Sequence, residues 1–320
     1  MISGGTESPG IHPDVFAMPP GLSIRYDAPA AGIADSITGY HVYTAASTEE
    51  RVDWFLPGTA NIRVALDSGP VDLTIRRRTY APLPAVSLFG PTSQAMRAVT
   101  RGGTVIGIGV SALGWSRLFP RSASDYRDRI VPLADAIGQA FADELKDTLA
   151  ATDRERLVKP ALDALFARRL GPPHADAPHI RQLMALIVDE RVDALATAAA
   201  EMGLPTHTLR RLAARHFGFP PKSLLLRARF LRAFTRMLRA GDVLDYSTLG
   251  SSYFDASHFL RDARAFLGTT PRRFMTQPTT FLQASLRARD AVLGAPTQVL
   301  HDVEQSRPLT PALDAPEPGP

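Results

Sequence analysis

The chain has no cysteine among its 320 residues, and this absence excludes several kinds of site. Without thiols there is no disulfide, no thiolate zinc site and no cysteine nucleophile. Long apolar runs are also lacking: the uncharged stretch over residues 102–116 is broken by glycine and is too short to span a bilayer. The first 21 residues contain neither an early basic residue nor an apolar run, so no secretory signal is indicated. We therefore expect a cytoplasmic protein without a membrane partner.

Lysine is scarce as well, and the positive charge, which is almost entirely arginine, is unevenly placed. Between Arg181 and Thr276 there are 15 Lys and Arg against 8 Asp and Glu, whereas the rest of the chain carries 21 against 24. A basic segment joined to a neutral-to-acidic body indicates that this segment alone binds a polyanion.

The N-terminal half shows the pattern of an all-β domain. Residues 1–21 have no periodic pattern and several prolines and glycines, so we expect them to be disordered. From residue 22, seven short runs rich in β-branched and aromatic residues alternate with turn residues. These runs are LSIRY, ITGYHVY, VDWFLP, NIRVAL, VDLTIRR, AVSLFG and TVIGIGV. They predict a β-rich sandwich or barrel-like domain over residues 22–120.

The second half of the chain has a helical pattern, so the whole chain is predicted to be an α+β protein. Apolar residues recur at helical spacing in 125–149 and 153–170, which predicts a helical connector over 121–177. An all-α domain is expected over 178–278. Residues 279–320 form a C-terminal extension with one helix near its start and a proline-rich, acidic end that we expect to be disordered.

Two consecutive helical segments in the all-α domain have the pattern of a helix-turn-helix. An alanine-rich helix, Val192–Met202, is broken by Gly203–Pro205, and a second helix starts at a cap on Thr206 or Thr208 and ends at Gly218. In a helix-turn-helix, the amino-terminal residues of the second helix meet base edges in the major groove. The candidate DNA-contacting residues here are Thr206, His207, Arg210, Arg211 and, one turn later, Arg215. Arginine pairs with guanine or with phosphate.

The same pattern recurs after a long amphipathic helix over residues 221–240. A short helix at 243–249 and a turn at 252–254 precede a helix that Asp255 is expected to cap, since aspartate accepts hydrogen bonds at helix starts and repels phosphate. The candidate contact residues are Ala256, Ser257, His258 and Arg261. For His258, packing or capping is an alternative to reading a base.

The combination resembles the DNA-binding domain of the AraC/XylS transcription-activator family over about 95 residues. The most specific stretches are TLRRLAARHFGFPPK (208–222), DASHFLRD (255–262) and GTTPRRF (268–274). The resemblance implies that two recognition helices enter successive major grooves on one DNA face, about one helical turn (~34 Å) apart, with the 221–240 helix fixing their separation. Ser252, Ala263 and Ala265 depart from the family pattern, so the second motif is expected to contact DNA less specifically.

The first half resembles, more loosely, the β-rich sensor domains of uncharacterised members of that family. The matching stretches are WFLPGTANIR (54–63), FGPTS (89–93) and GWSRLF (114–119). For this half the resemblance implies effector binding or dimerisation. Tyr40, Trp54, Phe55 and Phe89 provide aromatic surface for an apolar cavity or a dimer face. For Tyr40, Trp54 and Phe55, and for Tyr43, which is a further candidate for the cavity, core packing is the alternative.

No catalytic pattern is present, so we expect no enzyme activity, no cofactor and no metal. The stretch GIGVSALG (107–114) fits neither of the two motifs that it resembles. A dinucleotide-binding G-x-G-x-x-G motif needs glycine at position 112, which is alanine, and a serine-nucleophile G-x-S-x-G motif needs glycine at position 113, which is leucine. The histidines at 12, 41, 174 and 179 lack the paired spacing of a metal site.

We therefore expect a sequence-specific transcription regulator whose partner is double-stranded operator DNA. Further expected partners are a small-molecule effector or a second copy of the chain, bound by the N-terminal domain, and RNA polymerase if the chain is an activator. Two alternatives stay open: a ligand-independent DNA binder that recruits partners, and an enzyme domain fused to a DNA-binding domain. The alkyl-transfer repair regulators of the family are such fusions, but their chemistry requires cysteine.

Overall fold

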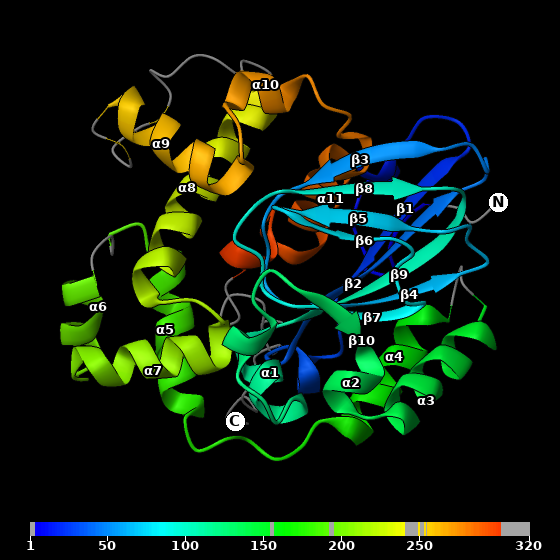
Figure 1. The fold of residues 1–320 in the computed structure, drawn as a ribbon. Helices are drawn as coiled ribbons and strands as arrows, with labels where there is room; N and C mark the ends of the chain where they lie inside the picture. The colour runs from blue at the N-terminus through cyan, green and yellow to red at the C-terminus, as the bar shows by residue number, and fades with distance from the viewer. Residues whose placement is uncertain are drawn as a thin grey trace, which may run out of the picture.

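The computed structural model of the chain describes residues 4–153, 157–191, 195–240, 249, 253 and 255–301. A β-rich body and a helical unit lie side by side, with further helices packed on one face of the body (Figure 1). The predicted α+β architecture, with a β-rich N-terminal domain and a helical C-terminal domain, is confirmed. Within the described residues, no helix combines the length and apolarity needed to cross a membrane.

The β-rich body consists of two antiparallel sheets. The six-stranded sheet has the order β1 (Leu22–Asp27), β2 (Ile37–Ala45), β9 (Gly103–Val110), β4 (Asn61–Leu66), β7 (Val86–Phe89) and β10 (Ile130–Pro132). The four-stranded sheet has the order β3 (Arg51–Phe55), β8 (Met96–Thr100), β5 (Asp72–Ile75) and β6 (Arg78–Tyr80). All seven predicted β runs are strands, and β6, β8 and β10 are additional.

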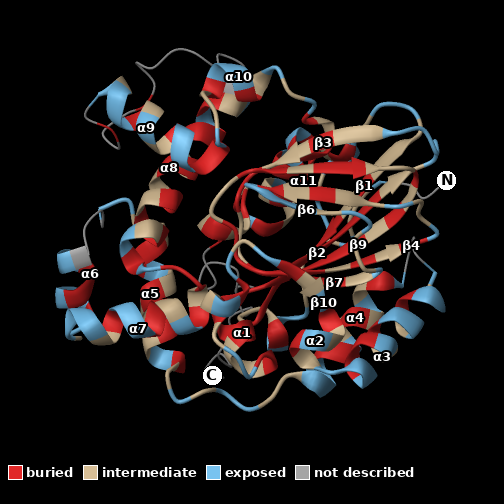
Figure 2. Cartoon of the chain, in the orientation of Figure 1, coloured by how far each residue is buried: buried red, intermediate tan, exposed pale blue. Residues whose placement is uncertain are grey.

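Period-two alternation gives the six-stranded sheet two different faces. Ile62 and Val64 of β4 belong to a core shared with α1 (Ala112–Leu118), α2 (Leu133–Ile137), α3 (Gln139–Ala150) and α4 (Val158–Arg169). Arg63, between those two residues, faces the opposite side, toward the second sheet. These helices therefore cover the outer face, and the inner face is left to line the space between the sheets (Figures 1 and 2).

Residues 4–21, which we expected to be disordered, are ordered against the sheet and α11 (Thr280–Leu293). Phe16, in the short helix η1 (Pro13–Phe16), is buried in a cluster with Tyr26 and Phe281. The Arg287 guanidinium donates to the Ala17 carbonyl at 3.0 Å. The expectation was wrong because isolated apolar residues bury surface without forming a periodic pattern. Residues 302–320, also expected to be disordered, lie outside the described part of the chain.

The helical unit is organised around the long helix α8 (Pro221–Ala240). The other helices are α5 (Ala177–Val188), α6 (Leu195–Glu201), α7 (Thr206–Phe217), α9 (Ala256–Leu267) and α10 (Pro271–Met275). Phe230 of α8 stacks on Phe259 and Phe266 of α9, with ring centroids 5.6 and 5.4 Å apart. The same core includes Leu56 and Leu113 of the N-terminal half, so the helical unit is docked onto the β-rich body.

Candidate nucleic-acid interface

The first motif is formed by α6 and α7. Gly203 and Gly218 both have positive φ, 59° and 80°, and Gly218 ends α7 in the left-handed conformation predicted for it. α7 begins at Thr206 directly after Pro205, and no side chain caps it, so the prediction of a threonine cap was wrong. Helical periodicity directs Leu209, Leu212, Ala213 and His216 into the core.

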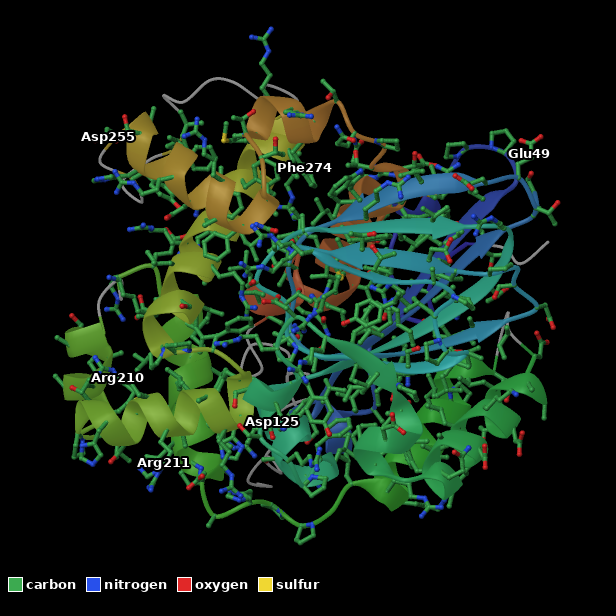
Figure 3. All side chains as sticks on the ribbon, in the orientation of Figure 1. Glu49, Asp125, Arg210, Arg211, Asp255 and Phe274 are labelled. Carbon is green, nitrogen blue, oxygen red and sulfur yellow. The ribbon has the colours of Figure 1, made fainter. Side chains whose placement is uncertain are left out.

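The opposite face of α7 is exposed and carries all the residues predicted to contact DNA in this motif. These residues are Thr206, His207, Arg210, Arg211 and Arg215. The side chains of Arg210 and Arg211 lie on the outer surface of the molecule (Figure 3). The structure thus groups these five residues on one helix face, opposite the buried face of α7.

The second motif ends in α9, which Asp255 caps as predicted. The Asp255 carboxylate accepts from the His258 amide N–H at 2.8 Å, and this bond holds the pKa of the carboxyl below its usual value. Ser257, His258 and Arg261 are exposed, and Ala256 is half-buried. Gly268 ends the helix with φ 75°. The short helix and turn predicted over 243–254 lie mostly outside the described residues.

The basic residues of the helical unit separate into two groups, which the sequence alone did not distinguish. One group is engaged by the protein: ion pairs join Arg181 to Asp35, Arg191 to Asp189, Arg229 to Asp262, both Arg232 and Arg236 to Glu190, and Arg239 to Asp290. Arg227 is buried. The other cations are exposed and, among the described residues, form no ion pair within 4.0 Å: Arg210, Arg211, Arg215, Lys222, Arg261, Arg264, Arg272 and Arg273.

The members of this second group, which we call the motif cations, all lie on α7, α9, α10 or the start of α8. An exposed cation without an intramolecular partner is available to neutralise a phosphate, whereas a paired cation must first lose its partner. The unpaired positive charge of the helical unit is therefore concentrated on α7, α9, α10 and the start of α8. Phosphate contacts of this kind position a protein on a duplex, and base contacts by the recognition helices supply sequence discrimination.

Arg227 has a structural role that sequence analysis missed. Its side chain is buried, and its Nη1 donates to the carbonyls of Gly58 at 3.1 Å and Thr92 at 2.8 Å. Burial lowers its pKa to about 10. Its position between Leu224 and Leu231, at helical spacing on the apolar side of α8, was the available signal. We call this contact the Arg227 clasp; it fastens α8 to the loops before β4 and β8.

A second unpredicted cluster lies where the linker meets α7. His174 and His216 both contact Asp176: His216 Nε2 is 2.9 Å and His174 Nδ1 is 3.7 Å from Asp176 Oδ2. The hydrogen bond with His216 lowers the pKa of Asp176, and burial lowers the pKa of His216. The folding of the chain thus brings together histidines that are 42 positions apart in sequence numbering. Because His174 Nδ1 also accepts the Asp176 amide N–H at 3.0 Å, we assign the cluster to fastening α7 onto the linker.

The N-terminal domain contains a cavity of about 460 Å³ between its sheets. Phe55 and Phe89 line it, as predicted. Tyr40 and Trp54 do not: Tyr40 is buried in the core under the helices, and Trp54 packs edge-on against Phe274 of α10. Since alternate residues of a strand face opposite sides, one aromatic run cannot direct all its rings into one cavity.

Comparison with known proteins gives a family match for the C-terminal part of the chain. A helix-turn-helix domain family matches residues 198–277. No curated protein matches the chain. Among solved structures, an apo variant of ToxT from Vibrio cholerae is 11% identical with a TM-score of 0.43, over 82% of this chain and 99% of that one.

Two further solved structures are similarly distant. ToxT from Vibrio cholerae with bound unsaturated fatty acid is 11% identical with a TM-score of 0.40, over 74% of this chain and 94% of that one. The AraC-like transcriptional activator CuxR is 13% identical with a TM-score of 0.21, over 68% and 88%. The family match and the two helical motifs joined by α8 identify residues 198–277 as a helix-turn-helix domain of the AraC type, the DNA-binding unit of a transcription regulator.

Proposed function

We propose that the chain regulates transcription by binding one face of an operator with both motifs, under the control of a small molecule bound in its N-terminal domain. The observation that carries this proposal is the placement of the motif cations. Every exposed cation of the helical unit that lacks an ion pair among the described residues lies on α7, α9, α10 or the start of α8. Such a distribution matches a polyanion that contacts both motifs at once.

The two motifs have different roles in this proposal. Thr206, His207, Arg210 and Arg211 at the start of α7 read base edges, and Arg215 contacts phosphate. On α9, Ala256, Ser257 and His258 contact DNA less specifically, and Arg261 binds phosphate. The 20 residues of α8 span about 30 Å at 1.5 Å per residue, close to the ~34 Å of one DNA turn. This length supports simultaneous binding in successive major grooves.

Control by the N-terminal domain would act through the Arg227 clasp. Gly58 and Thr92 are joined by two hydrogen bonds. The Thr92 amide N–H donates to the Gly58 carbonyl at 3.0 Å, and the Gly58 amide N–H donates to Thr92 Oγ1 at 2.8 Å. Both residues also line an interior cavity of the N-terminal domain. A ligand that shifts these loops changes how α8 is held. Such a ligand regulates only if it binds the DNA-competent and DNA-incompetent states with different affinity.

In this proposal the chain regulates and does not catalyse. Pairing of two copies, and contact with RNA polymerase if the chain activates, stay predictions.

The test is retention of a genomic DNA library by the purified full chain at low salt. We expect selective enrichment of a few fragments, which is lost in an Arg210→Ala, Arg211→Ala double variant. The matched control is Arg236→Ala, Arg239→Ala, which removes two exposed arginines of α8 that are paired with Glu190 and Asp290. Equal enrichment by wild type and the first variant, with both folded by circular dichroism, would overturn the assignment of α7 as the reading helix.

A further inference from the structure

The inner face of the six-stranded sheet carries polar groups where a closed core would be apolar. His41 and Tyr43 of β2 and Arg63 of β4 point to this side, with Ile62 and Val64 on the other. Gly107 of β9 makes room for the imidazole, because a Cβ on this glycine would lie 2.0 Å from His41 Cε1. The sequence therefore accommodates a polar interior here.

Two cavities meet at Arg63. The larger, about 460 Å³, is lined mainly by apolar side chains such as Leu73, Val105 and Phe281. The smaller, about 120 Å³, lies between the sheet, α11 and the segment around Gln298. Both are lined by Tyr43, Phe55, Arg63 and Phe89. The Arg63 Cζ atom lies 4.4 Å from the centroid of the Phe89 ring and 5.6 Å from that of Phe55, so the guanidinium stands at the boundary.

The smaller cavity is surrounded by buried polar atoms without partners. Within the described part of the chain, no hydrogen bond reaches His41 Nε2, Thr59 Oγ1, Arg289 Nη2 or Thr297 Oγ1, and all four residues line this cavity. Buried polar atoms in folded proteins are nearly always hydrogen-bonded. Four unpartnered atoms around one small cavity are thus a set of partners for a polar group.

The charges around the smaller cavity indicate which kind of polar group it binds. Arg289 of α11 is 5% exposed, and its Nη1 donates to the Ala295 carbonyl at 2.8 Å. Within the described ranges, the one hydrogen bond that Arg63 donates goes to the Asn61 side chain, at 3.3 Å. Among the described residues, no carboxylate lies within 4.0 Å of either guanidinium. Burial lowers the pKa of both arginines, to about 10 for Arg289.

Two acidic residues near these cations, Asp53 and Asp290, are engaged elsewhere and do not neutralise them. Asp53 binds Arg51 at 2.9 Å and the Phe281 amide N–H at 3.1 Å. Asp290, the neighbour of Arg289, binds Arg239 at 2.6 Å. A buried cation without a counter-charge is costly, and arginine binds carboxylate and phosphate groups with two parallel hydrogen bonds. The polar cavity therefore favours an anion over a neutral hydroxylated ligand.

We propose that the N-terminal domain binds an amphipathic anion, with its carboxylate or phosphate group between Arg63 and Arg289 and its apolar part in the larger cavity. This inference rests on the proposed function, because it names the chemical class of the effector. It also gives the ligand a route to DNA binding: Gly58 and Thr92, which form the Arg227 clasp, line the same polar cavity.

The experiment measures binding of four probes to the full chain below their micelle concentrations, by calorimetry and by thermal shift. The probes are decanoate, decyl phosphate, 1-decanol and decylamine, which share an apolar chain and differ in the head group. We expect at least one anion to bind about tenfold or more tightly than the alcohol or the amine. The tighter of the two anions identifies the head group.

Variants test the two arginines. Arg289→Gln is expected to remove most of the preference for the anion, and Arg287→Gln, an exposed arginine on the same helix, is the control that leaves it intact. A second pair guards against misfolding: Arg63→Lys keeps a cation and retains the preference, and Arg63→Met loses it. Equal affinity for decanol and both anions, no binding of either anion, or equal losses in Arg287→Gln and Arg289→Gln would each overturn the proposal.

The effect on DNA separates this inference from the proposed function. Each bound probe is added to the full chain on a DNA fragment selected from the genomic library. An anion that binds through Arg289 without changing DNA affinity would leave the ligand class standing and refute its role as an effector. Selective DNA binding with no anion binding would leave the DNA-binding proposal standing and refute this one.

Discussion

The separation of the arginines into paired and unpaired groups predicts which substitutions change the salt dependence of DNA binding. Arg261 of α9 is exposed and belongs to the motif cations. Arg236 of α8 is also exposed, with 50% of its side chain accessible, but it is paired with Glu190. Arg261→Gln and Arg236→Gln are therefore matched changes that remove one positive charge each from neighbouring helices.

The magnitude follows from the release of counterions. Each phosphate that the protein neutralises adds about 0.9 to the magnitude of the slope of log affinity against log salt. If all the motif cations contacted phosphate, the two motifs would give a slope of about −7, and base contacts by Arg210 and Arg211 make the actual slope shallower. We expect Arg261→Gln to reduce the magnitude by about 0.9 and Arg236→Gln to leave it unchanged.

The assay is fluorescence anisotropy of a labelled duplex, chosen from the selected genomic fragments, titrated with each protein between about 50 and 200 mM KCl. Circular dichroism checks that both variants stay folded. Equal reductions of the slope by the two variants would refute the reasoning, because total charge rather than the position of unpaired cations would then govern binding.

Three further predictions concern specificity and stability. Arg210→Ala should cost about 1–3 kcal/mol at the preferred site and relax one base position in a selection experiment; an unchanged consensus would show that Arg210 binds phosphate. Burial lowers the pKa of His41 and of His301, the latter to about 3. As the pH falls below about 6.5, these histidines therefore bind protons in the unfolded state and not in the folded state, so the free energy of unfolding decreases. Each of these histidines should then remove up to roughly 1.4 kcal/mol of stability per pH unit, and equal urea midpoints at about pH 7.5 and about pH 5.5 would contradict this. Phe230→Ala removes a side chain with 0% exposure from the centre of the helical unit and should cost about 3–5 kcal/mol in denaturant unfolding; a loss under about 1 kcal/mol would contradict the assigned packing.

Local periodicity was sufficient to predict most of the elements and the exposed face of α7. The alternating runs are strands because one face of each must be buried. Two of the three missed strands, β6 and β10, have only three residues each, and β10 ends in Pro132. On α7, the spacing of Leu209, Leu212 and His216 fixes the buried side, so the exposed position of Arg210 and Arg211 follows.

Contacts between distant segments were not predictable in the same way. Arg227 is buried because loops about 135 and 169 positions away meet it, and no local pattern contains those loops. Arg229 and Arg261 are both arginines on amphipathic helical patterns, and the sequence gives no sign that they differ. In the structure Arg229 forms an ion pair with Asp262 at 2.8 Å, whereas Arg261 forms no ion pair among the described residues. The polar cavity likewise forms only when α11 closes over β2 and β4, which brings Arg289 to His41 and Arg63.

The central claim is that both motifs bind DNA together on one face, and hydroxyl-radical footprinting of the full chain on a selected duplex tests it most directly. We predict two protected patches on the same face, about one helical turn (~34 Å) apart, with Arg210→Ala weakening one patch and Arg261→Gln the other. A single protected patch that responds to both substitutions, or protection that does not depend on either arginine, would contradict the account.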